Sequence, residues 1–209
     1  MTEATLNLDQ VEHFPRATAR RRENRLFDLC VACAGLPVVI LAALLLLIIN
    51  PVFNRGPLIY RQARMGRDGA SFEILKFRTM QPAGGTRAFN APLEEARIGH
   101  LGRFLRRHRI DELPQLVNIL RGDMNLIGPR PDAYEHARVF AALIPNYMRR
   151  HEVRPGITGL AQVELGYAQG LAATRAKVSA DLRYIRERTW RLDLPILWRT
   201  LRIVCLGEA

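Results

Sequence analysis

Two adjacent carboxylates, Asp111 and Glu112, lie between a run of arginines and a stretch whose apolar residues have helical spacing. The helix predicted through residues 116–120 has Pro114 in its first turn and ends at Gly122. Partial positive charge at the start of a helix keeps a nearby carboxylate ionised, and an ionised aspartate can attack a phosphorus atom. The alternative is that both side chains cap the helix and pair with arginines. These residues alone leave both interpretations open.

Cationic side chains precede and follow the carboxylate pair. Residues 97–109 carry apolar side chains at helical spacing, interleaved with the arginines Arg97, Arg103, Arg106, Arg107 and Arg109. Downstream, Pro129 and Pro131 hold Arg130 on a stiff turn after Gly128. A rigidly presented arginine is suited to binding a diphosphate.

A second Gly/Pro-rich loop spans residues 153–162 and contains Pro155, Gly156, Thr158 and Gln162. It is interpreted either as a wall that binds a ligand or as a structural turn. The sequence of this loop alone does not distinguish between the two interpretations.

A short β-hairpin is predicted upstream, because residues 58–64 and 71–78 flank a turn that contains glycines. The hairpin places Lys76 and Arg78 near one strand end. Residues 81–92 are rich in Gly, Pro and Ala and predict a loop. That loop is either a mobile cover over a site or a plain connector.

One long apolar segment precedes all of these elements. Residues 29–49 carry no charged side chain, and a helix of this length reaches across roughly 30 Å of hydrocarbon. Arginines flank both ends, namely Arg16, Arg20, Arg21, Arg22 and Arg25 before the segment and Arg55, Arg61, Arg64 and Arg67 after it. The positive-inside rule therefore asks both ends to face the cytoplasm. Pro37 would bend the helix so that it enters and leaves on one face, and a kinked single-pass anchor is the alternative.

The C-terminal part, residues 173–203, predicts a helix broken at Pro195. Trp190 and Trp198 alternate there with arginines and leucines. Such a helix suits a bilayer interface, where each basic group near an anionic leaflet contributes about 1 kcal/mol. Packing against the domain core is the alternative.

The composition narrows the classes of partner. The chain has 209 residues, 48% of them hydrophobic, and its 31 Lys plus Arg against 20 Asp plus Glu give a formal charge of +11. The hydrophobic content and the length exclude a disordered or collagen-like chain and fit one domain. The positive charge indicates a partner that is nucleic acid, an anionic membrane surface or a phosphorylated substrate. The cysteines are odd in number. Cys30 and Cys33 stand in an apolar run without a second ligand pair, which favours small core residues over a metal or redox site.

Several motifs, in the same order and spacing, resemble the bacterial sugar transferases. These are the monotopic phosphoglycosyl transferases that initiate the assembly of bacterial surface glycans, and the resemblance runs from about residue 25 to residue 206. The motifs are Lys76-Phe77-Arg78-Thr79-Met80, Phe104-Leu105-Arg106, Asp111-Glu112-Leu113-Pro114-Gln115-Leu116, Gly122-Asp123-Met124, Gly128-Pro129-Arg130-Pro131 and Arg154-Pro155-Gly156-Ile157-Thr158-Gly159-Leu160-Ala161-Gln162.

The resemblance implies a mostly helical α+β fold. It implies a monotopic membrane protein with a re-entrant helix kinked at Pro37, a short β-hairpin and amphipathic interface helices. Residues 1–25 are then a basic N-terminal segment, residues 26–53 the re-entrant membrane helix and residues 54–209 the cytoplasmic catalytic domain. The location implied is the bacterial inner membrane, with the catalytic domain on the cytoplasmic face.

The resemblance also implies the transfer of a sugar 1-phosphate from a UDP-sugar to undecaprenyl phosphate, with release of UMP. This is the first membrane step of exopolysaccharide, O-antigen, capsule or glycoconjugate synthesis. Asp111 matches the nucleophile that forms a covalent aspartyl phosphosugar, and Glu112 matches the residue that binds Mg²⁺. The positions implied for substrate phosphate are Lys76, Arg78, Arg106 and Arg130, and those in the substrate-binding loops are Gly128, Pro129, Pro155, Gly156, Thr158 and Gln162.

The chain departs from the family pattern in places. Leu36 precedes Pro37, where a serine is common, and residues 163–167 differ where specificity for the sugar or nucleotide is set. The sugar, the glycan pathway and a homodimeric assembly are left open. Nucleic acid is not an expected partner, because only 7% of the residues are aromatic and no groove-reading motif is present. The intact Asp111-Glu112 pair argues against a non-catalytic scaffold.

Overall fold

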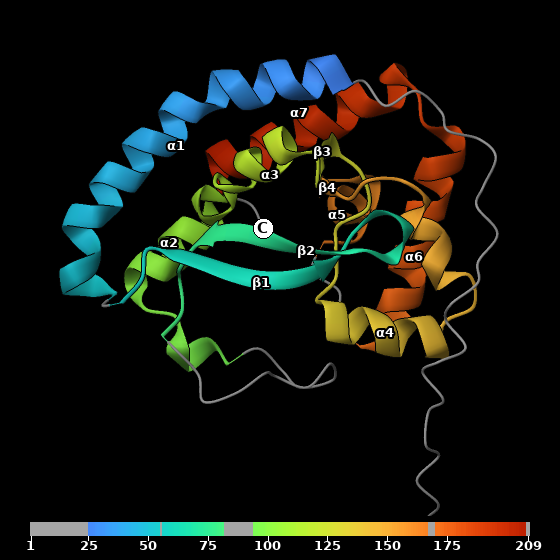
Figure 1. The fold of residues 1–209 in the computed structure, drawn as a ribbon, viewed down its shortest axis with the longest axis horizontal. Helices are drawn as coiled ribbons and strands as arrows, with labels where there is room; N and C mark the ends of the chain where they lie inside the picture. Colours follow the sequence, from blue (N-terminus) through green and yellow to red (C-terminus); the bar gives the residue numbers. More distant parts are fainter. Residues whose placement is uncertain (1–24, 55, 82–93, 167–169, 208–209) are drawn as a thin grey trace, which may run out of the picture.

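The computed structural model describes residues 25–54, 56–81, 94–166 and 170–207, and it is mostly helical (Figure 1). The α-helices are α1 Arg25–Phe53, α2 His100–Arg107, α3 Gln115–Arg121, α4 Tyr134–Leu143, α5 Leu160–Leu165, α6 Leu171–Glu187 and α7 Trp190–Leu206. The strands are β1 Ile59–Met65, β2 Ser71–Phe77, β3 Asn125–Ile127 and β4 Gly156–Thr158. Short 3₁₀ turns are η2 Arg67–Gly69, η3 Glu95–Arg97, η4 Ile110–Glu112 and η5 Tyr147–Glu152.

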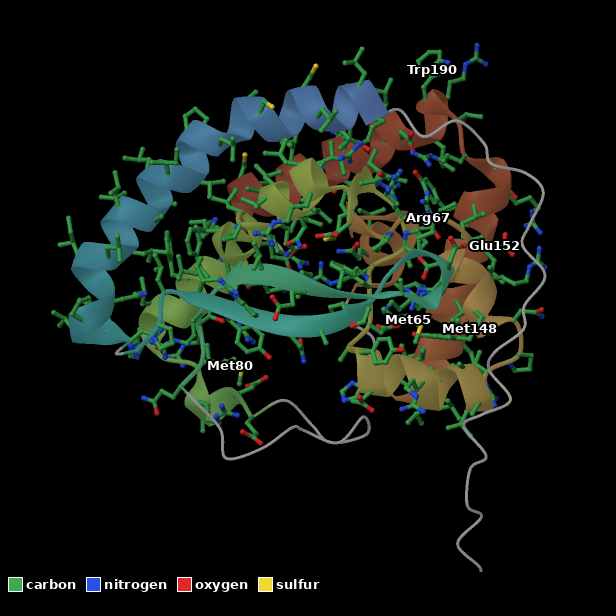
Figure 2. All side chains as sticks on the ribbon, in the orientation of Figure 1. Met65, Arg67, Met80, Met148, Glu152 and Trp190 are labelled. Carbon is green, nitrogen blue, oxygen red and sulfur yellow. The ribbon has the colours of Figure 1, made fainter. Side chains whose placement is uncertain are left out.

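The predicted hairpin is confirmed. Strands β1 and β2 pair antiparallel, from Ile59 opposite Phe77 to Met65 opposite Ser71. Its buried side chains reach different neighbours, since Ile74 packs in a cluster with α1 and α3 while Met65 packs with α4 and Met148. Figure 2 places Met65 and Met148 close together between the hairpin and α4. The hairpin therefore contacts both the cluster formed with α1 and α3 and the cluster formed with α4.

The two Gly/Pro-rich loops are joined to each other. Asn125 and Ile127 of β3 pair in parallel with Gly156 and Thr158 of β4. The backbones approach so closely that a Cβ on Gly156 would lie 2.1 Å from the Gly128 nitrogen. These glycines are thus required by close packing of two strands.

Helix α1 covers the predicted apolar segment and curves over the outside of the molecule, above α3 and α7 (Figure 1). Within the described part of the chain it is the one helix long and apolar enough to cross a membrane. Ala32 and Leu46 are buried against the domain, whereas the opposite face leaves Leu41 and Ile48 exposed. Figure 2 shows side chains projecting outward along this face.

The prediction that Cys30 and Cys33 are core residues is wrong. Both are exposed on α1, because they lie on the side of the helix away from the buried Ala32. Cys205 is exposed as well. All three thiols are free.

The break predicted at Pro195 lies elsewhere. Helices α6 and α7 are separated at Arg188 and Thr189, where the Thr189 hydroxyl accepts a hydrogen bond from the Leu192 backbone and caps α7. Helix α7 continues through Pro195, which only removes one backbone donor from it. Trp190 points away from the ribbon at the start of α7 (Figure 2). The predicted loop at 81–92 lies outside the described residues except for Gln81.

Candidate active site

The carboxylate pair lies in a tight turn of its own. Asp111 and Glu112 belong to the 3₁₀ turn η4, which follows Arg109 in a left-handed conformation with φ 53°. Helix α3 begins only after Pro114 and ends at Gly122, as predicted. The prediction that the pair lies at the start of α3 is therefore wrong, because the two residues lie one turn earlier. Helix α2 and turn η4, and not the first turn of α3, orient the two carboxylates.

Glu112 is surrounded by cations contributed by three separate elements. Its side chain is only 7% exposed. Lys76 Nζ from β2 donates to Glu112 Oε1 at 2.9 Å, and Arg130 Nη1 donates to Oε2 at 3.1 Å. Arg130 Nη2 also donates to Oε1, and Arg109 Nη1 lies 3.7 Å from the same oxygen. The hairpin, the turn and the segment after β3 thus converge on one carboxylate.

The two neighbouring carboxyls have opposite pKa shifts. Burial alone would raise the pKa of Glu112, but the charges of Arg130 and Lys76 and a hydrogen bond from Arg130 hold it well below its usual range. Burial raises the pKa of Asp111, and the charge of Glu112 raises it further, against the partial opposition of Lys76, Arg106 and Arg130. The surrounding cations therefore favour the anionic form of Glu112, and Asp111 is the more basic partner.

Asp111 is buried, and its Oδ1 accepts no hydrogen bond within the described structure. Its neighbour Glu112 takes up the nearby cations instead. A desolvated carboxylate oxygen without a partner needs no bonds broken before it attacks an electrophile. This arrangement suits nucleophilic attack by Asp111 more than a structural cap.

Arg106 and Arg78, both predicted to bind phosphate, lie in different surroundings. Arg106 Nε donates to the Thr79 hydroxyl at 2.8 Å, and its positive charge acts on Asp111. The Arg78 guanidinium instead donates to the carbonyl oxygens of Asn54, Pro57 and Met80. In this structure the Arg78 donors are thus used by backbone carbonyl oxygens, and a phosphate-binding role for Arg78 stays a prediction.

The predicted loop residues make hydrogen bonds within the β3–β4 region and to α7. Thr158 shares a 2.7 Å hydroxyl contact with Thr200 of α7, and Gln162 donates to the Ile157 carbonyl at 3.2 Å. Gly128, Pro129, Pro155 and Gly156 belong to the backbone that joins β3 to β4, with Gly156 N donating to Pro129 O at 3.0 Å. The segment between β3 and β4 presents the Arg130 side chain to Glu112, and a substrate-binding role for these loop residues stays a prediction.

Residues 19–207 match the model of the family described as bacterial sugar transferase. The chain belongs to the bacterial sugar transferase family. It is 44% identical over 171 residues to the UDP-glucose:undecaprenyl-phosphate glucose-1-phosphate transferase of Caulobacter vibrioides, covering 80% of this chain and 60% of that protein. It is 41% identical over 185 residues to the UDP-N-acetylgalactosamine-undecaprenyl-phosphate N-acetylgalactosaminephosphotransferase of Aeromonas hydrophila, covering 88% of this chain and 44% of that protein.

This sugar transferase thus spans about half the length of the two relatives just described. A relative of similar size is the uncharacterized sugar transferase EpsL of Bacillus subtilis, which is 35% identical over 190 residues that cover 88% of each chain.

Two contributors to the sugar transferase site were not predicted as site residues. Arg109 reaches Glu112 from the left-handed position before the turn, and Thr79 orients Arg106. Arg109 was visible in the arginine run, but its sequence position did not distinguish it from Arg103 or Arg107. Only the folded turn shows that Arg109 lies close to Glu112.

Glu112 of this sugar transferase fits Mg²⁺ in one respect. It is a buried carboxylate, and Mg²⁺ prefers carboxylate oxygens together with substrate phosphates and water. Within the residues that the structure describes, no cluster of three or more His, Cys, Asp or Glu could hold a metal without such help. The fit therefore includes the phosphates of a bound substrate among the ligands.

Proposed function

We propose that this chain transfers a sugar 1-phosphate from a UDP-sugar to undecaprenyl phosphate and releases UMP. The observation that carries the proposal is the buried, unpartnered Asp111 oxygen beside a Glu112 held by Lys76 and Arg130. The printed names of the Caulobacter and Aeromonas relatives support the donor and acceptor classes. They differ in the sugar, so the sugar is left unspecified.

The transfer takes place in two balanced steps. Asp111 attacks the phosphorus that bears the sugar, the bond to the UMP oxygen breaks, and an aspartyl phosphosugar forms. An oxygen of the acceptor phosphate then attacks the same phosphorus and releases the Asp111 carboxylate. Phosphoryl transfer depends on charge neutralisation and positioning, which Lys76, Arg106 and Arg130 would supply. The soluble donor product leaves before the lipid acceptor binds.

Mg²⁺ is part of the proposal. Glu112 would hold it together with phosphate oxygens of the donor. Bound there, it would offset the negative charge that develops on the leaving UMP. Because Lys76 and Arg130 already occupy Glu112, the diphosphate must share these cations when the ion binds.

We also propose that α1 enters and leaves the bacterial inner membrane on its cytoplasmic face. At the start of α1, the Arg25 guanidinium donates to the carbonyl oxygens of Ile119 and Met124 at 2.5 and 3.2 Å. At the end of α1, Asn54 Nδ2 donates to the Arg78 carbonyl at 2.7 Å. Both ends are thus bound to the same folded unit, which supports the re-entrant arrangement over a straight span.

The topology makes a direct prediction. A tag placed before Thr2 is expected to react with an impermeant reagent only when the cytoplasmic side of membrane vesicles is exposed. The same holds for a tag after Ala209, which serves as the matched control. Labelling of the first tag from the outer side, with the second tag protected, would contradict the re-entrant arrangement.

The activity is tested with the purified protein in detergent. Given Mg²⁺ and undecaprenyl phosphate, it is expected to release UMP from at least one member of a panel of UDP-sugars that includes UDP-glucose and UDP-N-acetylgalactosamine. Removal of the metal with EDTA is expected to stop the release, and added Mg²⁺ to restore it. A folded protein that releases no UMP from any sugar in the panel contradicts the proposal.

A further inference from the structure

The backbone that carries Arg130 is fixed at four successive carbonyl oxygens, those of residues 129–132. Each accepts a hydrogen bond from a different donor. In order, the donors are Gly156 N at 3.0 Å, Arg150 Nη2 at 2.7 Å, Arg64 Nη1 at 2.9 Å and Met65 N at 3.2 Å. Two of these donors are arginine side chains that do not contact Glu112 themselves. A segment held in this way has little freedom to shift the side chain it presents.

Arg150 is a fully buried donor, with its side chain 0% exposed. Its Nη1 donates to Asp132 Oδ2, and its Nη2 lies 2.7 Å from Asp181 Oδ2 on α6. Lys177 Nζ donates to the other Asp132 oxygen at 2.6 Å, so two cations balance two carboxylates. The Tyr147 hydroxyl also donates to Asp132 Oδ2 at 2.8 Å.

A buried ionic group of this kind is not explained by stability alone. Desolvating two ion pairs is costly, and well-packed apolar side chains of similar volume often stabilise a core equally well. What the ions provide is a fixed geometry, because a guanidinium reaches several acceptors in one plane. Here Nη2 of the Arg150 guanidinium donates to the Arg130 carbonyl oxygen.

We propose that Arg150, anchored by Asp132 and Asp181, is a positioning residue that sets where the Arg130 guanidinium stands against Glu112 and the substrate phosphate. Arg150 does not touch the substrate. It acts through one hydrogen bond to the backbone of Arg130, whose side chain binds both Glu112 oxygens. The inference rests on the proposed function, because it assigns Arg130 to the phosphate of the donor.

The test is a double-mutant cycle between Arg150 and Arg130. Arg150→Lys keeps the charge but cannot reach both carboxylates and the Arg130 carbonyl. It is expected to lower kcat/KM for UMP release about 100-fold, because a misplacement of ~1 Å costs on this order. In an Arg130→Lys background the same substitution is expected to cost less than about 3-fold, since the group it positions has gone. Equal losses in both backgrounds would overturn the proposal.

The same double-mutant cycle is measured with Asp181→Asn in place of Arg150→Lys. The proposal can therefore still be tested if the Arg150→Lys variant does not fold. The matched control is Tyr184→Phe. It removes a buried hydroxyl that donates to Asp193 at 2.8 Å, as Tyr147 does to Asp132. Thermal unfolding is followed for every variant, and the control is expected to lose stability with less than about a 2-fold change in kcat/KM.

The cycle is repeated on the affinity for UDP, which needs no turnover. A wild-type protein that binds UDP but releases no UMP would contradict the proposed function, while the coupling between Arg150 and Arg130 is still measured. Additive effects on UDP affinity would overturn the positioning role alone.

Discussion

Asp111→Asn is expected to abolish UMP release, with a fall of at least about 10⁴-fold in kcat, the scale seen when a catalytic side chain is removed. The amide has nearly the shape of the carboxylate, so the buried turn η4 keeps its packing. The neutral amide has no anionic oxygen with which to attack phosphorus, so no acyl phosphate forms. Burial first, and then the charge of Glu112, raise the pKa of Asp111, so its carboxylate is the more basic of the pair.

A labelled donor gives the sharper measurement. With undecaprenyl phosphate withheld, wild-type protein is expected to retain the radiolabelled sugar phosphate through denaturation, whereas Asp111→Asn retains none. Asp68→Asn is the matched control, because it makes the same chemical change in an exposed hairpin turn. Asparagine tolerates the positive φ of that position, so the control is expected to keep full labelling. Label on the Asp111 variant would rule out Asp111 as the nucleophile.

The parts of the fold set by local patterns were predictable from sequence. The hairpin followed from two short runs around a glycine-containing turn, and the end of α3 followed from Gly122, which has the positive φ of 92° that a helix end favours. The apolar segment of α1 followed from composition alone. In each case the deciding interactions lie within a few residues.

Long-range contacts decided the rest. Arg78 and Lys76 are two residues apart and looked equivalent, yet Lys76 reaches Glu112 and Arg78 binds the end of α1. The pairing of Arg150 with Asp132 and Asp181 joins segments far apart in the chain, and no spacing rule anticipates it. The separation of Asp111 and Glu112 from the start of α3 likewise depends on the left-handed Arg109.

Gly156→Ala is expected to be the most destabilising of the single-methyl changes in the loops that hold Arg130. The added Cβ would lie 2.1 Å from the Gly128 nitrogen and 2.6 Å from the Thr158 carbonyl oxygen. Both are backbone atoms, which cannot rotate away as a side chain can. Overpacking of this kind costs about 3 kcal/mol, and for a chain of this length the Tm falls by roughly 6–12 °C. Thermal unfolding in detergent measures the shift.

Gly99→Ala provides the comparison that separates crowding from the loss of a glycine. Gly99 lies at the start of α2 with φ −66°, and the nearest atom to a Cβ added there would be the Phe53 carbonyl oxygen at 3.9 Å. Its Tm is expected to change by no more than about 2 °C, because the new methyl meets ordinary contact distances. Since β3 leads directly into Arg130, Gly156→Ala should also lower kcat/KM below the temperature at which it unfolds. An unchanged Tm in that variant would mean that β3 and β4 do not pack as closely as described.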